Sequence, residues 1–225
     1  MSALPDPLAL RNLTLAEIPQ ALELSKEARW NQIADDWQFM IAEGKAFGFF
    51  TNENELVASA LALPFNGSFG WISMVLVTSA WRRKGLATKL LRHGIEMLET
   101  DGKKPLLDAT EAGRKVYLSM GFNDLYPISR LERSGMTQAK TSLVPLSPSV
   151  AVRQIKESDL TNLAAWDQQF FGADRSILLS NLFYRDPNLA FLAEDTSKSL
   201  LGFVMGRMGR NATQIGPVVS TTSVI

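Results

Sequence analysis

Apolar and polar residues near the start of the chain follow the spacing of a strand and two helices. Residues 8–13 predict a short strand. Thr14 and Glu17 then form the T-x-x-E pattern of a capping box, in which each side chain bonds to a main-chain N–H group at a helix start. We expect one helix from here and a second helix over 31–43, which ends before Gly44.

The next stretch is rich in apolar residues and contains Asn66-Gly67, a strong signal for a tight turn between strands. It predicts three antiparallel strands, then a helix, a strand, a helix and a last strand. These elements are expected at residues 45–51, 56–65, 68–77, 86–100, 104–110, 111–120 and 128–134. They indicate an α/β domain in which helices flank a mixed, mostly antiparallel sheet.

Beyond residue 134 the composition shifts to Ser, Thr and Pro, and the order of strand, helix and strand then starts again. We expect a first domain over 1–134, a linker over 135–149, and a smaller α/β domain over 150–225 that repeats the first half of the same fold. The alternative is that any strand–helix–strand pattern resembles another. The repeat ends in an uncharged stretch, 214–225, whose strand edge we expect to be covered by the first domain, a second copy or further C-terminal residues.

Composition and charge exclude several classes of protein. Hydrophobic residues make up 46% of the 225 residues, which favours a packed core. Lys plus Arg and Asp plus Glu both number 23, so the broad basic field of many nucleic-acid-binding proteins is absent. With no cysteine and one histidine, the chain has no disulfide and no Cys- or His-rich metal site, and we expect no metal. It shows no secretory signal and no apolar run of about 20 residues, so we expect a cytoplasmic protein that spans no membrane.

The stretch WRRKGLATKLL, residues 81–91, is the strongest candidate for a binding site. It places Arg82, Arg83 and Lys84 before Gly85, between a predicted strand and a predicted helix start. The first N–H groups of a helix have no partner within the helix and attract anions, and a glycine lets the main chain approach a phosphate closely. The spacing is neither that of a P-loop nor that of a dinucleotide-binding motif. The residues alone leave two interpretations, an anion site and a solvated surface loop.

The same stretch resembles the acyl-CoA-binding motif of the GNAT superfamily of N-acyltransferases, [R/Q]-x-x-G-x-[G/A], which here is Arg82-x-x-Gly85-x-Ala87. A second stretch, LLDATEAGRKVYLSMGF (106–122), resembles the family's strand–helix unit, which contains a tyrosine and ends in Gly-Phe. The order of the preceding elements also matches, so the resemblance covers about residues 8–134. It implies a GNAT-like fold and acetyl-CoA as co-substrate.

The resemblance also implies roles for individual residues. Tyr117 would donate a proton to the departing thiolate of CoA. Main-chain groups at the end of the third antiparallel strand would pair with the pantetheine amides, and the N–H groups that follow would hold the pyrophosphate. The residues implied for the cofactor are Leu76, Val77, Arg82, Arg83, Lys84, Gly85, Leu86, Ala87, Thr88, Thr110 and Gly113.

Three positions depart from the family's usual residues. Ser79 stands where proline is common, which makes the turn less rigid. Thr110 stands where asparagine is common and Gly113 where alanine is common. None of these changes removes an essential group, because a hydroxyl can replace one amide hydrogen bond.

The general base and the acceptor site have no fixed motif. Asp108 is the candidate base, with Glu111 as a second candidate, but Asp108 is also explained as a hydrogen-bond acceptor at a strand end. The residues that could line an acceptor cavity are Trp30, Asp35, Asp36 and Trp37, and the alternative for the two aspartates is the solvent face of a helix. The single histidine, His93, lies about two turns into the helix after the basic stretch, so we expect a structural or surface role for it.

These observations predict an N-acetyltransferase that moves the acetyl group of acetyl-CoA to a primary amine by direct attack in a ternary complex. The amine would belong to a small molecule or a peptide, and a homodimer is left open. The alternative is a non-catalytic CoA-binding sensor or assembly module. Nucleic-acid binding through Arg82, Arg83 and Lys84 is disfavoured, because three cations in a neutral chain make few phosphate contacts.

Overall fold

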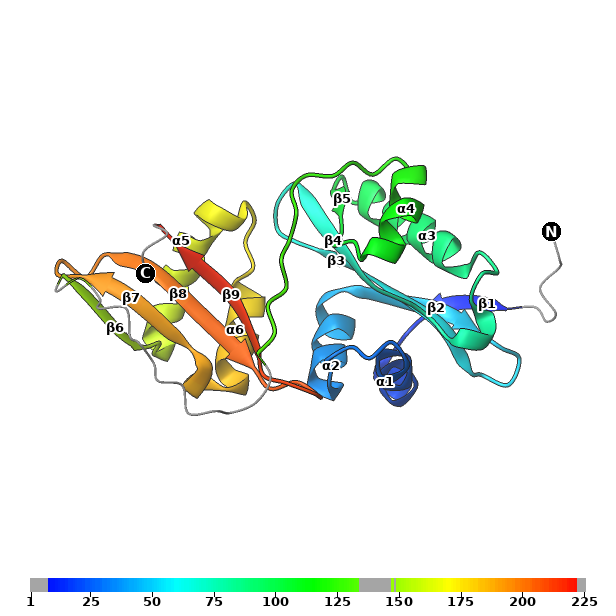
Figure 1. The fold of residues 1–225 in the computed structure, drawn as a ribbon, viewed down its shortest axis with the longest axis horizontal. Helices are drawn as coiled ribbons and strands as arrows, with labels where there is room; N and C mark the ends of the chain where they lie inside the picture. The colour runs from blue at the N-terminus through cyan, green and yellow to red at the C-terminus, as the bar shows by residue number, and fades with distance from the viewer. Residues whose placement is uncertain (1–7, 134–146, 148, 222–225) are drawn as a thin grey trace.

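The strands of the described residues form two separate sheets, which divide this part of the chain into two lobes (Figure 1). The computed structural model describes residues 8–133, 147 and 149–221, so the predicted linker lies mostly outside the described residues. The first sheet has the order β1-β2-β3-β4-β5. Its strands are antiparallel except for the parallel pair β4 and β5. They are β1 (Ala9–Asn12), β2 (Lys45–Phe50), β3 (Leu56–Pro64), β4 (Phe69–Val77) and β5 (Lys104–Leu106).

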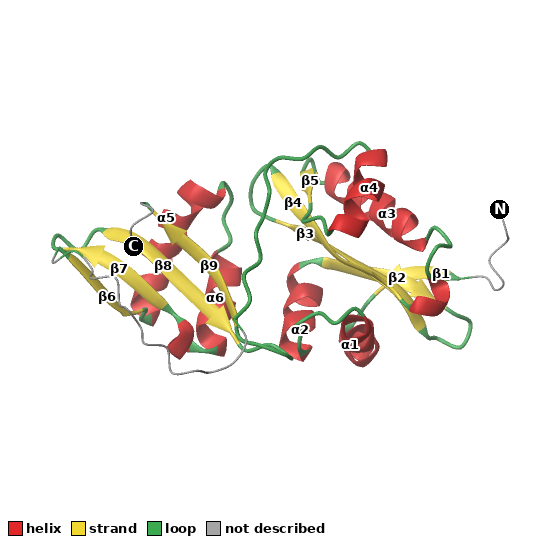
Figure 2. Ribbon diagram, in the orientation of Figure 1, coloured by secondary structure: helices red, strands yellow, loops and turns green. Residues whose placement is uncertain are grey.

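Helices cover both faces of the first sheet (Figure 2). One face carries α1 (Ile18–Glu27) and α2 (Ala34–Glu43), and the other carries α3 (Leu86–Thr100) and α4 (Glu111–Ser119). The sheet therefore has a hydrophobic core on each side. None of the helices in the described ranges is long and apolar enough to cross a bilayer.

The second sheet has the order β6-β7-β8-β9, and all its strands are antiparallel. They are β6 (Val150–Gln154), β7 (Phe191–Asp195), β8 (Leu200–Arg207) and β9 (Gln214–Ser220). Helices α5 (Leu160–Phe171) and α6 (Ser176–Arg185) connect β6 to β7 and pack on the sheet through buried leucines and Phe203. Each lobe thus begins with a strand, two helices and three further strands.

The irregularities of the two sheets also correspond. In the first sheet the register shifts between β2 and β3 at Phe49/Phe50, and between β3 and β4 at Ser59/Leu61. In the second sheet it shifts between β7 and β8, and between β8 and β9. A bulge inserts one extra residue and bends the strand, so both fourth strands bend at a similar place.

Most elements predicted for the first lobe are confirmed. The helix α3 spans the predicted residues, and Thr14 and Glu17 form the predicted capping box, with 2.7 Å between the Thr14 nitrogen and the Glu17 carboxylate. The strand predicted over 128–134 is wrong in its described part, since 128–133 form no strand and pair with none. They are exposed, and the segment after α4 runs between the lobes (Figure 1). An alternating pattern forms a strand only where a neighbouring strand completes its hydrogen bonds.

The two lobes meet first at the turn between β3 and β4. Phe65 and Phe69 contact the ring of Phe171, which ends α5, at centroid distances of 5.0 and 5.5 Å. The nitrogen of Asp174 donates to the carbonyl of Asn66 at 3.2 Å. The turn of the first sheet therefore packs against the segment between α5 and α6.

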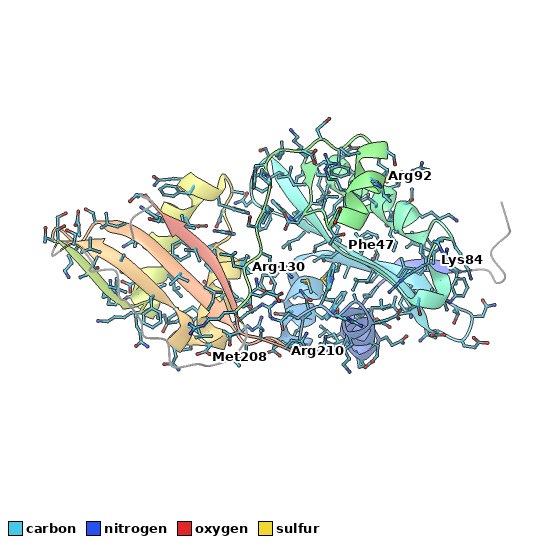
Figure 3. All side chains as sticks on the ribbon, in the orientation of Figure 1. Phe47, Lys84, Arg92, Arg130, Met208 and Arg210 are labelled. Carbon is cyan, nitrogen blue, oxygen red and sulfur yellow. The ribbon has the colours of Figure 1, made fainter. Side chains whose placement is uncertain are left out.

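In the second contact the roles of the lobes are exchanged: the hairpin turn belongs to the second lobe and the interhelical segment to the first. The turn between β8 and β9 packs against Asn31, in the segment between α1 and α2. The side chain of Asn31 accepts hydrogen bonds from the nitrogens of Asn211 and Ala212 and donates to the carbonyl of Ala212, at 2.7, 3.1 and 2.8 Å. Arg210 donates to the carbonyl of Trp30 and lies between the lobes (Figure 3). Each lobe thus presents its last hairpin turn to the interhelical segment of the other.

A buried ion cluster completes the interface between the lobes. The carboxylate of Asp36 accepts a hydrogen bond from the main-chain nitrogen of Ile33 at the start of α2. It also pairs with Arg185 and Arg207 at 2.7 and 2.8 Å. The side chain of Asp36 is 8% exposed, and those of the two arginines are 15% and 13% exposed. Because these charges are largely removed from water, the pairing of all three matters to stability.

We predict that Asp36→Asn lowers the melting temperature by about 6–12 °C, as expected for a loss of about 3 kcal/mol in a chain of this size. The amide keeps the shape of the carboxylate, but Arg185 and Arg207 then face each other without a compensating charge. Thermal unfolding followed by circular dichroism measures the shift. Asp35→Asn is the matched control, since that carboxylate is 62% exposed and 4.0 Å from Arg185. An equal shift in both variants would contradict the prediction.

Candidate active site

The first sheet opens between β4 and β5. The two strands pair only through Phe69, Gly70 and Trp71 with Lys104, Pro105 and Leu106. Beyond that point β4 continues to Val77 with no partner on its β5 side among the described strands. Such a strand edge carries unpaired N–H and C=O groups, and an extended ligand can pair with it.

A bulge in β4 decides which groups face this open edge. Met74 has a positive φ of 53°, and the register shifts here, so Ile72 lies in the core under α3 whereas Met74 lies in the core under α1 and α2. Further along, the nitrogen of Thr78 donates to the carbonyl of Val57 on β3. Main-chain groups alternate in direction along a strand. Those of Val77 therefore face the open edge.

The same alternation corrects one predicted residue. Leu76 pairs with Ser59 and directs its main-chain groups to β3, so these are not available to a ligand at the open edge. Val75 takes its place, because its groups point the same way as those of Val77. Counting alternate residues back from the end of β4 could have identified Val75 from the sequence, had the orientation of one residue been known.

The loop after β4 exposes a run of unbonded N–H groups. Among the described residues, the main-chain nitrogens from Arg83 to Thr88 have no acceptor. Arg83 and Gly85 have positive φ values of 61° and 79°, the left-handed conformation that occurs in main-chain turns that bind anions. Leu86, the first residue of α3, is buried and anchors this helix start in the core. The loop has the geometry of an anion site, with the dipole of a 15-residue helix behind it.

The three cations of the loop have different surroundings. The guanidinium of Arg82 turns back, because its Nε donates to the carbonyl of Val77 at 3.1 Å and its terminal nitrogen pairs with Glu27 at 3.2 Å. Lys84 lies over the ring of Trp81, 4.4 Å from its centre. Arg83 is exposed and bonds to no described residue. Lys84 lies at the end of the first sheet remote from the second lobe (Figure 3), so the loop is built by the first lobe alone.

Tyr117 lies on α4 and packs against the same core as Val75 and Val77. Its hydroxyl forms no hydrogen bond with a described residue, so it is free to donate to a ligand. Burial raises the pKa of Tyr117 above the ordinary value of 10.0, which keeps the phenol protonated near neutral pH. The ring lies over Gly113, where a side-chain carbon would come within 2.9–3.0 Å of it. The hydroxyl of Thr110 caps α4, because it accepts a hydrogen bond from the main-chain nitrogen of Gly113 at 3.2 Å.

Asp108 lies between β5 and α4 and accepts a hydrogen bond from the side chain of Trp71. Desolvation by its surroundings raises the pKa of Asp108 above the ordinary 3.8, and the Trp71 bond and the charge of Arg130 act in the opposite direction. Arg130 comes from the segment that runs between the lobes (Figure 3). Glu111, the second candidate base, is exposed in the first turn of α4.

This arrangement of an open strand edge, an anion loop and a phenol agrees with the comparisons with known proteins. A sequence model of the acetyltransferase (GNAT) family matches residues 10–122, half of the chain. The chain belongs to the GNAT acetyltransferase family. An uncharacterized N-acetyltransferase of Bacillus subtilis, YitH, is 22% identical over 204 residues, which are 90% of this chain and 69% of that protein.

Solved structures show the same fold across both lobes. An acetyltransferase-like protein from Pyrococcus horikoshii superimposes with a TM-score of 0.69 at 20% identity, over 98% of this chain and 74% of that one. A conserved protein of unknown function from Enterococcus faecalis V583 superimposes with a TM-score of 0.63 at 12% identity, over 97% of this chain and 60% of that one. The fold shared with these two proteins therefore includes the second sheet.

The four residues predicted for the acceptor site of this GNAT domain lie in different environments. Trp37 does not line a cavity: it is fully buried, and its indole N–H donates to Ser25 at 3.0 Å. The carboxylate of Asp36 is taken up by the ion cluster between the lobes, which corrects both interpretations of that residue. Asp35 is exposed, as expected for the solvent face of a helix. Trp30 is partly buried beside the same core as Met74.

His93 packs against the core of the GNAT domain rather than facing the open edge. Its ring meets Phe47 edge to face, with 4.8 Å between the centres. This contact supports the expected structural role. Within the described ranges, no group of three His, Cys, Asp or Glu side chains is arranged to hold a metal ion.

We predict that Asp108→Asn raises the melting temperature at pH 7 and that this gain disappears when the pH falls below about 3.8, the ordinary pKa of the group. The folded-state pKa is raised, so between the two values the folded chain binds more protons than the unfolded chain, and stability falls as pH rises. The amide has no charge to desolvate. Melting curves from pH 3 to 8 test this, and a gain that persists at low pH would show another cause.

Proposed function

We propose that this chain transfers the acetyl group of acetyl-CoA to a primary amine, as the family membership and the site geometry suggest. The observation that carries the proposal is the run of unbonded N–H groups from Arg83 to Thr88 at the start of α3. A pyrophosphate offers anionic acceptors that match such a run. The pantetheine arm would extend from there along the open edge of β4.

The pantetheine arm contains amides, and the groups of Val75 and Val77 at the open edge would pair with them as an added strand would. The carbonyl of Val77 already accepts one bond from Arg82, and a carbonyl oxygen can accept a second. This pairing would hold the thioester near the bulge at Met74. Positioning of this kind supplies a large part of the rate in a reaction between two bound molecules.

In the proposed reaction the amine nitrogen attacks the carbonyl carbon of the thioester and forms a C–N bond. The tetrahedral intermediate collapses, the C–S bond breaks, and the sulfur leaves with the electron pair. Tyr117 would protonate this thiolate, since its hydroxyl is unbonded and its pKa is raised. The proton lost by the amine would pass to Asp108, directly or through water, because its raised pKa makes it a better base than an ordinary aspartate.

We further propose that residues 150–225 are an incomplete second copy of the first domain. The shared order of strands and helices, the matching register shifts and the reciprocal contacts of the two hairpin turns support this. The loop that would follow β9 lies beyond the described residues. The acceptor would be a small-molecule or peptide amine, and a cytoplasmic location and a homodimer stay predictions from the sequence.

The proposed function predicts release of free thiol from acetyl-CoA on addition of a suitable amine from a panel. Gly85→Glu should abolish both this release and the binding of acetyl-CoA, because the new carboxylate meets the pyrophosphate. Gly102→Glu is the matched control: it also has a positive φ, nothing lies within 4 Å of an added side chain, and it follows the other end of α3. Binding without thiol release for any amine would favour the non-catalytic sensor instead.

Tyr117→Phe should lower kcat by about 100-fold, the lower end of the effect of a general acid, with little change in the KM for acetyl-CoA. The ring and its packing over Gly113 stay, and only the proton donor is lost. Steady-state kinetics by thiol detection measures both constants. An unchanged kcat, or a loss confined to KM, would assign Tyr117 to packing alone.

A further inference from the structure

Glu27 joins α1 to the loop after β4. It lies in the last turn of α1, and its Oε1 accepts the main-chain N–H of Ser79 at 2.6 Å. The same oxygen pairs with the guanidinium of Arg82 at 3.2 Å. These partners lie 52 and 55 residues away in the sequence, and no local pattern requires the contact. One carboxylate oxygen therefore holds both ends of a short turn.

The turn held in this way is the 3-10 turn Ser79–Trp81 that leads into the anion loop. The guanidinium of Arg82 extends the contact, because its Nε donates to the carbonyl of Val77 at the end of β4. Glu27, Arg82 and Val77 thus form a chain of hydrogen bonds from α1 to the open edge. This chain meets the loop immediately before the unbonded N–H groups begin at Arg83.

The Ser79 N–H group is the distinctive part of this contact. It is the first donor of the turn, and such donors have no partner within the turn itself. A proline at this position has no N–H and fixes φ by its ring. Thr78 before it has φ −60° and ψ 151°, the conformation that a following proline favours. Ser79 leaves the turn without that ring, and Glu27 supplies a hydrogen bond instead.

We propose that Glu27 is a positioning residue for the anion loop, an inference that rests on the proposed function. Glu27 contacts neither the open edge nor the run from Arg83 to Thr88, so it acts through Ser79 and Arg82. Holding the turn fixes the positions of the unbonded N–H groups before a ligand arrives. An ordered loop loses less conformational entropy on binding, so the effect falls on affinity for acetyl-CoA and not on the chemical step.

An exposed Glu–Arg ion pair alone would contribute little to the affinity for acetyl-CoA. The side chains of Glu27 and Arg82 are 36% and 52% exposed, and such pairs contribute weakly in water. The bond from the Ser79 N–H to a carboxylate is charge-assisted and stronger. Glu27→Gln keeps an oxygen acceptor for that N–H and loses the ion pair, whereas Glu27→Ala loses both. The two variants therefore separate the contributions.

The test measures acetyl-CoA binding by calorimetry and steady-state kinetics for Glu27→Ala and Glu27→Gln. We expect Kd and KM to rise about tenfold for the alanine variant and about threefold or less for the glutamine variant, with kcat within twofold of wild type. Glu23→Gln is the control one turn earlier on α1, where the carboxylate pairs with exposed Lys26. Binding by Glu27→Ala within twofold of wild type would overturn the proposal.

The serine-to-proline change tests the mechanism. In a Ser79→Pro background the ring holds the turn, so Glu27→Ala should then weaken binding by no more than about threefold. An equal tenfold loss in both backgrounds would show that Glu27 acts in another way and would overturn the proposal.

Hydrogen exchange without ligand separates this inference from the proposed function. In Glu27→Ala the N–H groups of Trp81 and Arg82, which are hydrogen-bonded within the turn, should exchange faster than in wild type, and an unchanged rate contradicts the positioning role whatever the protein binds. Wild-type protein that binds no acetyl-CoA would overturn the proposed function, and with it the link from Glu27 to affinity.

Discussion

The hydrogen-bonding capacity that β4 and the start of α3 leave unused is the constraint on which the site depends. β3 satisfies one side of β4 along its length, whereas β5 satisfies the other side for three residues only. The bulge at Met74 turns the rest of the strand away, and the loop that follows leaves its N–H groups unbonded. Exposed main-chain groups of this kind persist only where the surrounding packing holds them, and here the buried Leu86 and the chain of contacts through Arg82 do so.

Because of this constraint, the cationic side chains of the basic stretch contribute less to the candidate anion site than their charges suggest. Arg82 is committed to Val77 and Glu27, and Lys84 lies on Trp81. Arg83 is the exposed cation of this stretch without a described partner, and its main chain has the left-handed conformation. The geometry of the main chain, and not a positive surface patch, makes this stretch a candidate anion site.

The second lobe meets the first at the opposite end of the sheet. Its hairpin turn binds Asn31, and its arginines pair with Asp36, so it holds the segment between α1 and α2 and the start of α2. That segment begins directly after Glu27, at the end of α1. The anion loop is therefore complete within the first lobe, while the second lobe fixes the helices on one face of the sheet.

The sequence predicted those features that depend on residues close together in the chain. The capping box at Thr14 and the limits of α3 were available from side chains a few residues apart. The strand predicted over 128–134 failed because pairing depends on a neighbour that the sequence does not name. The ion cluster of Asp36 joins residues 149 apart, and Glu27 bonds across 52, so neither left a local signal. The motif predicted the loop, but Leu76 was assigned wrongly, because adjacent residues of a strand direct their main-chain groups to opposite sides and only Val77 of this pair faces the open edge.

The central claim is that main-chain N–H groups, and not cationic side chains, hold the pyrophosphate of acetyl-CoA. The most direct test is ¹⁵N–¹H NMR of the full chain on titration with acetyl-CoA. The amide resonances from Arg83 to Thr88 should shift most, with those of Val75 and Val77, while amides of β7 and β8 stay unchanged. Saturable binding that leaves the amides from Arg83 to Thr88 unmoved would contradict the account.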